Sequence, residues 1–517
     1  MRNKFNRNIY RGILMFSFVL LLSFMLFGIS SVWAYLNTGA DRSKMLHAEL
    51  ISEDVYLPKV VWEPLNNEGR FMDNASLKNI EEDYLKAWYI KNVAYKTNSN
   101  YGIADFYTDS ARVNIYNTIE INKKAEITIE TTTLNHEPKL EFYSEDGKLV
   151  VFTDKNVVEF QKIYQNKKLV LTTKDTSNYK VLLLLEDGFW RVRHLVKMKS
   201  EKNELVTVSK SFAEVKNAEI YVDNKPFLIK GINYYPQANP WSMFDADFDE
   251  NIIENDFKII KKTGLNSIRI FIQYEDFGKA KVKLEKLKKL KTVLDLAENI
   301  GLKVIVTLFD FYGDYSLLNW TLTHRHVEQI VAEFKNHKAI LAWDIKNEPD
   351  LDFESRTKEN VLEWLSQMVN EIKKFDSNHM VTIGWSTTQA AVNLKDEVDF
   401  VSYHYYQDIN NFETAFQQLK KDVPNRPLVL QEFGVSSYRG IWNPFGYSEN
   451  DQAEYHKKMQ AIFKKDSLAF MSWGLYDFKF IPSSVAGVLP WRKLKQKYFG
   501  FINEKRNPKP SFLYISN

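Results

Sequence analysis

Apolar positions in the C-terminal part of the chain follow two alternating patterns. From about Ala218, short apolar runs alternate with longer stretches whose apolar residues recur every three or four positions. In "ENVLEWLSQMVNEIKKF" such residues fall on one helical face: Val361, Leu365, Met368 and Ile372. Short runs predict strands at residues 227–235, 265–272, 302–310, 339–348, 379–385, 398–406, 427–434 and 469–478.

Eight strands separated by amphipathic helices over about 300 residues are typical of a (β/α)₈ barrel. We therefore predict a TIM barrel over residues 216–517. A doubly wound open sheet is the structural alternative. No glycine-rich phosphate loop follows the first strand, which argues against the nucleotide-binding version of that sheet.

A different pattern precedes the barrel, over residues 75–205. Helical spacing after a possible cap at Ser76 gives way to short strand-like runs, and Glu186-Asp187-Gly188 between the last two indicates a hairpin. The pattern predicts a small α+β domain that resembles the cone-shaped nuclear-transport-factor-2-like fold. A β-sandwich is the alternative. No residue set in it forms a convincing site, so we expect a spacer or a domain that docks a protein partner.

The N-terminus is read from charge and hydropathy. Basic residues occupy a tail over residues 1–12, an uncharged apolar run covers 13–36, and residues 37–74 lack periodicity and predict a linker. An apolar run of about 20 residues can cross a bilayer. We therefore expect a membrane anchor with the N-terminus in the cytoplasm and an extracytoplasmic remainder. The alternative is a signal peptide cleaved near Ala34, which would release a secreted protein.

Composition narrows the function. Hydrophobic content of 44% with 26% charged residues indicates a folded chain, and a net charge of +3 gives no general reason to expect nucleic-acid binding. The lysine-rich run over residues 279–291 has leucines at helical spacing, so we interpret it as a solvated helix face. The chain has no cysteine, which excludes disulfides and thiolate metal sites.

Candidate chemistry gathers at the predicted strand ends, because the active site of such a barrel lies at the carboxyl ends of its strands. The fourth strand ends in Asn347 and Glu348, and the seventh carries Glu432. Other polar or aromatic residues at strand ends are Arg269 on the second strand, His404 and Tyr406 on the sixth, Trp473 on the eighth, and Asn233, Tyr234 and Tyr235 on the first.

Two facing carboxylates suit glycoside hydrolysis. One acid protonates the leaving oxygen while the other attacks the anomeric carbon, and retaining enzymes hold the two about 5–5.5 Å apart. We expect Arg269 to keep Glu432 ionised, and the charge of Glu432 to raise the pKa of Glu348. Asn347 would donate to the sugar 2-hydroxyl, and Trp473 would stack on a pyranose face.

Residues 218–515 resemble a clan A retaining glycoside hydrolase, most closely family 5, the cellulase and mannanase family. The matching segments are "KGINYYP", "GLNSIRIF", "AWDIKNEPD", "VSYHYY", "LQEFG", "MSWGLYDF" and "YFGFINEKRNPKPSF". The resemblance implies that Glu348 is the acid/base and Glu432 the nucleophile, and that no cofactor or metal is needed. It also implies which residues line the subsite where the bond breaks: Asn347, Arg269, His404, Tyr406 and Trp473.

Some alternatives stay open at this point. The Asn-Glu pair is shared across the clan, including family 2. Family 5 enzymes often carry a histidine at the end of the third strand, where this chain has "TLFDFYG" with Phe309, Asp310 and Tyr312. The substrate is predicted to be a β-linked poly- or oligosaccharide, with its sugar unassigned. Alternatives to hydrolysis are transglycosylation and a non-hydrolytic carbohydrate-binding or polysaccharide-assembly role. His324 and His326, one residue apart on a helix, are interpreted as structural or surface residues rather than metal ligands.

Overall fold

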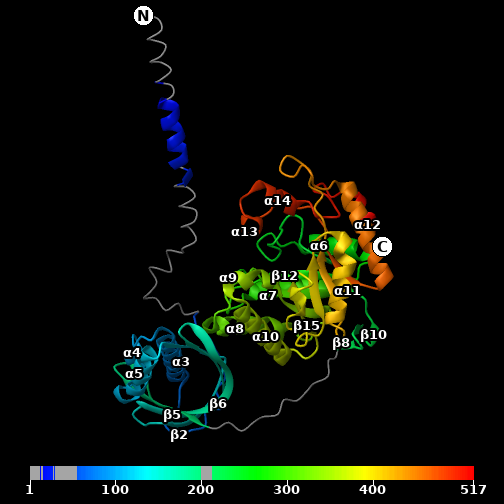
Figure 1. The fold of residues 1–517 in the computed structure, drawn as a ribbon. Coiled ribbons are helices and arrows are strands. Elements are labelled where there is room, and N and C mark those ends of the chain that lie inside the picture. Colours follow the sequence, from blue (N-terminus) through cyan, green and yellow to red (C-terminus); the bar gives the residue numbers. More distant parts are fainter. Residues whose placement is uncertain (1–11, 13–14, 27, 30–54, 199–211, 517) are drawn as a thin grey trace, which may run out of the picture. The chain divides into compact units, whose positions relative to one another are not determined.

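The computed structural model describes residues 12, 15–26, 28–29, 55–198 and 212–516. The chain divides into two compact units, Met1–Val55 and Tyr56–Asn517. The second unit contains both a small α+β domain and a barrel, and every site discussed below belongs to it. Figure 1 traces the order of the elements along the chain.

The predicted membrane anchor is corrected by the structure. Within residues 13–36 the described positions 15–26 and 28–29 are helical. Among the described residues, no helix is both long and apolar enough to cross a membrane. The prediction of a single-pass, extracytoplasmic protein depended on that helix and is wrong on this finding. Ala34, residues 1–11 of the predicted basic tail and residues 37–54 of the predicted linker lie outside the described residues.

The small domain begins earlier than predicted. Residues 56–73, assigned to the linker, contain strands β1 (Lys59–Val60) and β2 (Glu68–Gly69), which both pair with β4. Tyr56 and Met72 are buried in the core of the domain. Two-residue strands carry too little periodicity to be recognised from sequence, which explains the difference.

Three helices follow: α3 (Asn74–Thr97), α4 (Ile103–Phe106) and α5 (Asp109–Lys124). The cap of α3 is Asp73, whose carboxylate accepts from the backbone N–H of Ser76 at 2.9 Å, rather than Ser76 itself. Tyr84 and Trp88 on α3 are almost wholly buried. They anchor the helix against the sheet, where α3 contacts β3 and β7.

One seven-stranded sheet completes the domain, so it is an α+β unit and not a sandwich of two sheets. Its longer strands are β3 (Ile127–Thr133), β4 (Asn135–Tyr143), β5 (Leu149–Gln165), β6 (Lys168–Glu186) and β7 (Phe189–Met198). The predicted hairpin is present between β6 and β7, and its turn consists of Asp187 and Gly188, both with positive φ. Figure 1 shows the long strands curving beside the helices.

Eight parallel strands form a closed barrel, which confirms the predicted TIM architecture. They are β11 (Lys230–Asn233), β12 (Ser267–Gln273), β13 (Lys303–Asp310), β14 (Ile340–Asn347), β15 (Met380–Trp385), β16 (Val401–Tyr405), β17 (Leu428–Phe433) and β18 (Ala469–Trp473). β18 pairs with β11 and closes the ring. Nearly all positions of these strands are buried because both faces of a parallel sheet are covered.

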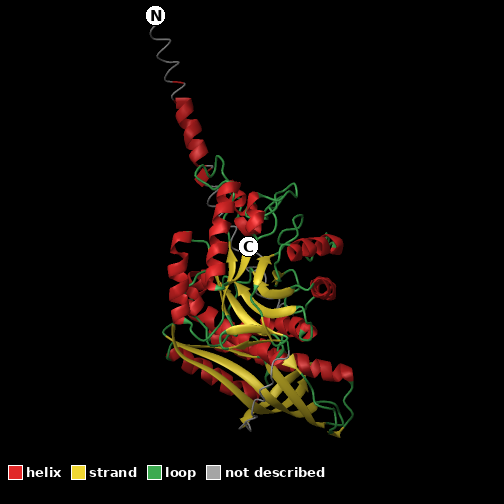
Figure 2. Ribbon diagram, turned by 90° about the vertical axis from the view of Figure 1, so that its right-hand side faces the viewer, coloured by secondary structure: helices red, strands yellow, loops and turns green. Residues whose placement is uncertain are grey.

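Helices surround the barrel, as Figure 2 shows in red around the yellow strands. The longer ones are α6 (Glu250–Lys262), α7 (Leu284–Ile300), α8 (Trp320–Phe334), α10 (Lys358–Phe375), α11 (Phe412–Asp422) and α12 (Glu449–Asp466). Shorter ones are α9 (Phe353–Arg356), α13 (Ser483–Ala486) and α14 (Pro490–Lys497), with 3₁₀ turns η1 (Leu317–Asn319), η2 (Pro349–Asp352), η3 (Ala390–Val392), η4 (Ile409–Asn411) and η5 (Pro510–Tyr514).

Two helix predictions can be compared directly with the structure. On α10 the predicted face is buried at every position: Val361, Leu365, Met368 and Ile372. On α7 the lysine-rich face is largely solvated, but Lys286 is only 3% exposed. Its ammonium lies 2.6 Å from Asp245 and 2.7 Å from Asp276, so two carboxylates compensate for its burial.

A small antiparallel sheet closes the amino-terminal end of the barrel. It consists of β8 (Ala213–Lys216), β9 (Glu219–Val222) and β10 (Lys225–Pro226). Ile220 and Val222 join one apolar cluster with Ile305, Leu341 and other residues at the amino-terminal part of the strands. This leaves the carboxyl-terminal end of the barrel for a site.

The small domain contacts helices α8 and α10 of the barrel. Lys162 on β5 is 3% exposed; it pairs with Glu363 and donates to Asn360 at 2.7 Å. The rings of Phe160 and Trp320 meet edge to face at 5.1 Å. These contacts combine a desolvated ion pair with aromatic packing, so the small domain and the barrel share a continuous interface.

Candidate active site

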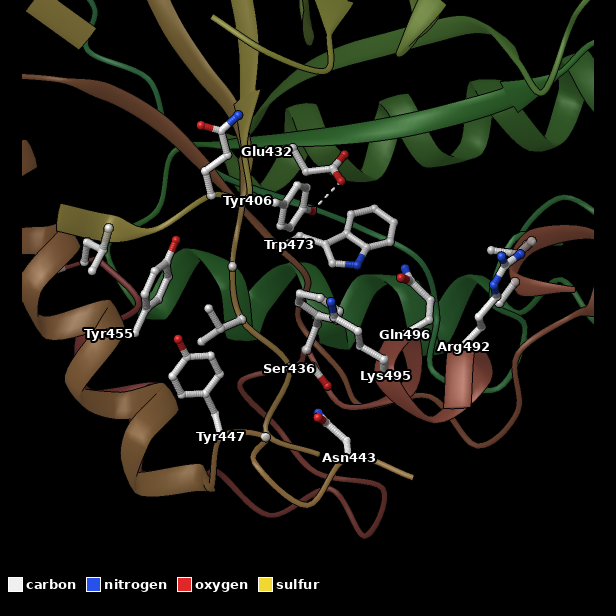
Figure 3. Close-up of a pocket in the computed structure, with 18 of the residues that line it drawn as sticks. Tyr406, Glu432, Ser436, Asn443, Tyr447, Tyr455, Trp473, Arg492, Lys495 and Gln496 are labelled. Atoms are coloured by element: carbon white, nitrogen blue, oxygen red, sulfur yellow. Dashed lines mark hydrogen bonds between the residues drawn. The ribbon is translucent and has the colours of Figure 1, made fainter. Parts of the chain in front are cut away.

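A cleft of about 1170 Å³ opens at the carboxyl-terminal end of the barrel. Its floor holds Glu348, which follows β14, and Glu432 on β17. In Figure 3 its walls are formed by Tyr447 and Tyr455 on one side and by Arg492 and Lys495 on the other. The residues that line it come from strand ends and the loops that follow them, as the barrel geometry predicts.

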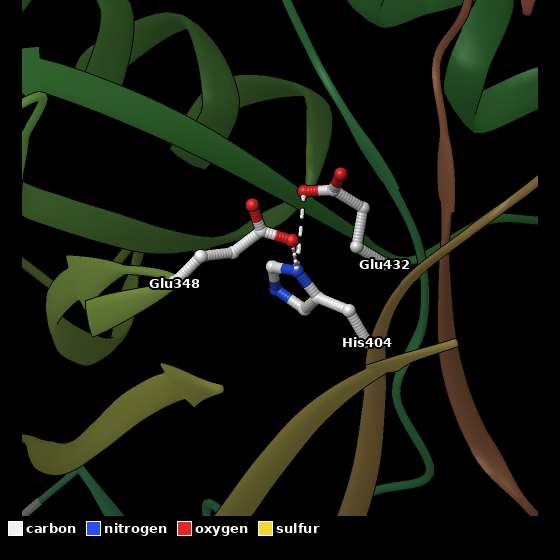
Figure 4. A group of neighbouring side chains, drawn as sticks. All are labelled: Glu348, His404 and Glu432. Carbon is white, nitrogen blue, oxygen red and sulfur yellow. Dashed lines mark hydrogen bonds and ion pairs between the residues drawn. The ribbon is translucent and has the colours of Figure 1, made fainter. Parts of the chain in front are cut away.

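Glu348 and Glu432 converge on one point in the floor. One oxygen of each carboxyl and a ring nitrogen of His404 all lie within 4.8 Å of one another (Figure 4). The side chain of Glu348 is 25% exposed and that of Glu432 is 9% exposed, so both remain accessible from the cleft. This upper limit on the distance between the nearest oxygens is compatible with the about 5–5.5 Å between carboxyl groups of retaining glycosidases and lies below the about 6.5–9.5 Å of inverting ones.

Arg269 organises this floor from below. Its fully buried guanidinium donates to Glu432 Oε2 at 3.1 Å and to Asn347 Oδ1 at 2.9 Å. Asp344 Oδ2 accepts from the Nη2 of Arg269 at 2.7 Å. A desolvated cation is stable there because two carboxylates and two amide oxygens, including Asn233 Oδ1 at 3.1 Å, surround it.

The backbone fixes the direction of Glu348. This residue has φ 48° and ψ 52°, a left-handed conformation that a non-glycine residue adopts only at a cost. Its N–H donates to the carbonyl of Gly384 at 2.7 Å, and the N–H of Gly384 donates to Asp344 Oδ1 at 2.9 Å. Gly384 on β15 therefore holds both the backbone of Glu348 and the carboxylate of Asp344, which pairs with Arg269.

Gly384 has to be glycine for a steric reason. A Cβ atom there would lie 2.8 Å from Arg269 Nη2 and 2.8 Å from Gln431 Oε1. Both distances are shorter than real Cβ contacts, so any side chain would push the guanidinium away from its partners.

Hydrogen bonds from β16 and the residue after it differ between the two carboxyls. Tyr406 donates its phenolic proton to Glu432 Oε1 at 2.5 Å. Nδ1 of His404 lies 2.9 Å from Glu348 Oε1 and 3.9 Å from Glu432 Oε2. Glu432 thus has two hydrogen-bond donors, Tyr406 and Arg269, whereas Glu348 has the imidazole.

The resulting pKa shifts run against the sequence-based expectation. Burial raises the pKa of Glu432 above its usual value, while His404 and Arg269 act against this rise. Burial also acts to raise the pKa of Glu348, but the hydrogen bond and charge of His404, together with the charges of Arg269 and Lys346, outweigh it and the pKa lies below its usual value. The expectation considered Arg269 and the second carboxyl, whereas the imidazole beside Glu348 decides the direction.

The substrate-contact predictions divide into three groups. Asn347, Tyr406 and Trp473 line the cleft together with the two glutamates. Arg269, Asn233 and His404 are each at most 1% exposed; they lie beneath the cleft and hold the residues above them.

Tyr234 lies elsewhere, and its predicted place in the substrate site is wrong. It is fully buried, and its hydroxyl donates to Asp256 on α6 at 2.9 Å. Successive side chains of an extended chain point to opposite sides, so Tyr235 faces the cleft and Tyr234 the surrounding helices.

Sequence reasoning named Tyr235 and Trp473 at strand ends but missed Phe271 and Trp241, which complete an aromatic wall beside the two carboxyls. Tyr235 stacks on Phe271 with ring centroids 5.1 Å apart, and Trp473 meets Trp241 at 6.0 Å. All four line the cleft. Trp241 comes from the loop after β11, where strand periodicity gives no signal; Phe271 lies two residues after Arg269 and shares its orientation, which is a signal that could have been used.

Two places in the described structure bring histidines into question as metal ligands: His404 with the two cleft glutamates, and the pair His324 and His326. Glu348, His404 and Glu432 are the group of described side chains whose spacing could hold a cation. Arg269 already donates to Glu432, so a guanidinium occupies one side of that set. His324 contacts Glu371 at 2.7 Å and His326 contacts the carbonyl of Lys279 at 2.9 Å, so both have structural partners.

Comparison with known proteins agrees with this geometry. Residues 223–479 match the family Cellulase (glycosyl hydrolase family 5). Mannan endo-1,4-β-mannosidase 5 of Solanum lycopersicum is 26% identical over 313 residues, covering 51% of this chain and 68% of that protein. β-Glucuronidase of Homo sapiens is 24% identical over 315 residues, covering 57% of this chain and 44% of that protein.

Among solved structures, an exo-β-1,4-mannosidase from Opitutaceae bacterium strain TAV5 matches with a TM-score of 0.49 and 17% identity, covering 59% of this chain and 61% of that one. The chain spans about half the length of the first curated relatives it matches. The matched residues 223–479 contain all eight barrel strands, β11 to β18, with Arg269, both cleft glutamates and the aromatic wall. The barrel, over the matched residues 223–479, belongs to glycoside hydrolase family 5 of clan A.

Proposed function

We propose that this protein hydrolyses β-glycosidic bonds of poly- or oligosaccharides with retention of anomeric configuration. The observation that carries the proposal is the placement of Glu348 and Glu432 oxygens within 4.8 Å of each other in the floor of an open cleft. A cleft of about 1170 Å³ exceeds the roughly 300–1,000 Å³ of ordinary small-molecule pockets, which favours a substrate of several sugar units.

In the first step, the Glu432 carboxylate attacks the anomeric carbon and forms a glycosyl ester. The bond from that carbon to the leaving oxygen breaks, and Glu348 transfers its proton to that oxygen. Arg269 and Tyr406 hold the two Glu432 oxygens at 3.1 Å and 2.5 Å, which orients the nucleophile toward the cleft.

In the second step, Glu348 acts as a base. It takes a proton from water, the water oxygen bonds to the anomeric carbon, and Glu432 leaves as a carboxylate. Two inversions at the same carbon give net retention. Asn347, fixed by Arg269 at 2.9 Å, is placed to donate its amide N–H to the sugar 2-hydroxyl, and Trp473 offers a ring face to a pyranose.

The reactive form has its proton on Glu348 and its charge on Glu432. Because the carboxyls interact closely, they titrate as a pair that holds one proton over an intermediate pH range. Arg269 and Tyr406 stabilise negative charge on Glu432 and so raise the share of the pair in the reactive arrangement, against burial of Glu432 and the His404 contact of Glu348, which favour the opposite arrangement. Activity should accordingly follow a bell-shaped pH profile.

The test is turnover of aryl β-glycosides by the purified protein. Glu432→Gln should abolish it, whereas Glu348→Ala should retain turnover of substrates with activated leaving groups, because these need no proton. Added azide should rescue the Glu348→Ala variant and yield a β-glycosyl azide. A wild-type protein that turns over no β-glycoside, or a Glu432→Gln variant with unchanged rates, would contradict the proposal.

A further inference from the structure

Residues 434–437, which directly follow β17 and its glutamate, are fastened to a buried lysine far along the chain. Three of them, Gly434, Val435 and Ser436, line the cleft. The fastening point is Lys509, which immediately precedes the turn η5 and is 2% exposed. The segment "YFGFINEKRNPKPSF" that contains Lys509 belongs to the family resemblance, but the proposed mechanism gives this lysine no role.

Four oxygen acceptors surround the ammonium of Lys509. Asp477, which lies beyond the end of β18 and is 1% exposed, forms an ion pair with it at 2.8 Å. The hydroxyl of Ser437 lies 2.9 Å away, and Gln452 Oε1 and the carbonyl of Tyr498 each lie 3.3 Å away. A buried cation is stable in such a place because a carboxylate neutralises it and the other oxygens accept its remaining protons. One side chain thus connects the segments after β17 and β18, helix α12 and the residue after α14.

Gln452 on α12 extends this connection to the cleft. Its side chain is fully buried, and its Nε2 donates to the carbonyls of Val435 at 2.9 Å and Phe499 at 3.0 Å. An amide accepts through its oxygen and donates through its nitrogen. Because Lys509 donates to the oxygen, it fixes the orientation in which the nitrogen reaches the two carbonyls.

Phe499 contacts the hydrogen-bond donor of the proposed nucleophile. Its ring meets that of Tyr406 edge to face, with the centroids 6.0 Å apart. The phenol of Tyr406 donates to Glu432 Oε1 at 2.5 Å (Figure 3). The series of contacts that begins at Lys509 therefore ends at the carboxylate of Glu432.

We infer that Lys509 is a positioning residue, which holds Phe499 against Tyr406 and so keeps the hydrogen bond to the proposed nucleophile in place. Lys509 itself does not line the cleft and so acts only through other residues. The inference rests on the proposed function and adds to it a residue that controls the nucleophile from outside the cleft.

The main test replaces the buried ion pair as a unit. Lys509→Met alone would leave the Asp477 carboxylate buried without its cation, which is strongly destabilising, whereas apolar residues of similar volume often replace both partners without such a loss. For Lys509→Met/Asp477→Leu we expect kcat to fall roughly 10–100-fold, the effect of misplacing a reacting group by about 1 Å. The acidic limb of the kcat/KM profile should move to higher pH, because ionised Glu432 loses part of its hydrogen bond.

A milder variant leaves the buried charges unchanged. Ser437→Ala removes one acceptor of Lys509 and should move the acidic limb in the same direction by a smaller amount. It decides the matter if the double exchange prevents folding. The matched control is Lys286→Met/Asp276→Leu, which makes the same exchange in another buried ion pair, 2.7 Å long, whose residues do not line the cleft. Its kcat and its acidic limb should equal those of the wild type.

Coupling to Tyr406 distinguishes positioning from a general structural role. In a Tyr406→Phe background, Lys509→Met/Asp477→Leu should move the acidic limb far less than in the wild type, because the hydrogen bond on which it acts is already absent. Equal shifts in the two backgrounds, or an acidic limb that neither Lys509→Met/Asp477→Leu nor Ser437→Ala moves, would overturn the inference.

A measurement without turnover keeps the inference separate from the reaction. Titration of the Glu432 carboxyl by ¹³C NMR should give a higher pKa in Lys509→Met/Asp477→Leu than in the wild type and the control. An unchanged pKa of Glu432 contradicts the inference. A raised pKa of Glu432, in a protein whose wild type turns over no β-glycoside, would sustain the positioning role while the proposed function fails.

Discussion

Nδ1 of His404 lies 2.9 Å from Oε1 of Glu348, and this contact lowers the pKa of the carboxyl against the effect of burial. His404 itself is fully buried beneath the cleft. A residue that touches no substrate therefore sets the pH at which the proposed acid loses its proton.

Replacing His404 with Ala should extend activity to higher pH. Without the imidazole the pKa of Glu348 rises, so the acid keeps its proton longer and the basic limb of the kcat/KM profile moves up. His404→Asn, whose amide can donate near the position of Nδ1, should move the limb less. A basic limb unchanged in His404→Ala would show that another group controls it.

Tyr406→Phe should shift the acidic limb of the kcat/KM pH profile. The phenol stabilises ionised Glu432, so its removal raises the pKa of the nucleophile further and shifts the acidic limb to higher pH. We expect kcat to fall roughly 10–150-fold, the effect of one hydrogen bond to a charged group. The control is Tyr405→Phe, since the Tyr405 hydroxyl donates to the carbonyl of Asp408 instead. Equal profiles for the two variants would argue against this role of Tyr406.

Gly384→Ala should reduce activity more than stability. The new Cβ would lie 2.8 Å from the Arg269 guanidinium, which must move and loosen its hold on Glu432 and Asn347. Overpacking of this kind costs about 1–3 kcal/mol in unfolding free energy. Denaturant unfolding and kcat/KM measured together check this. Gly313→Ala, where nothing lies within 4 Å of the new Cβ, should leave both unchanged.

Tyr234→Phe should reduce stability more than activity. The Tyr234 hydroxyl shares Asp256 with Tyr476, which donates at 2.5 Å, and it lies away from the cleft. Loss of this buried hydrogen bond should lower the unfolding free energy by about 1–3 kcal/mol while kcat/KM stays within roughly 2-fold. A large loss of kcat/KM at unchanged stability would return Tyr234 to the substrate site.

The barrel and its two glutamates could be predicted because continuous apolar runs mark buried parallel strands and their carboxyl ends form one rim. The hydrogen-bond and ion-pair partners of each side chain could not be predicted. Asp344, the counter-charge of Arg269, lies within an apolar run, and its position there was itself an unused signal. At the end of a strand, the sequence does not show which of two successive side chains points into the barrel and which points outward. For this reason Tyr234 was placed in the cleft in error.

Segments without hydrophobic periodicity account for the other differences between the predicted and the observed structure. The loop after β17 and helix α14, which supply Tyr447, Arg492 and Lys495 to the cleft, have no strand pattern to place them. The short strands β1 and β2 could not be recognised for the same reason. At the N-terminus, length and hydropathy alone predicted a membrane-spanning segment that the described helix does not provide.

The β8–β10 sheet seals the amino-terminal mouth of the barrel with the apolar side chains of Ile220 and Val222. Part of the packing that keeps the cylinder closed therefore lies at the end opposite Glu348 and Glu432. The loops that line the cleft can consequently change, by evolution or by design, while this sheet preserves the barrel.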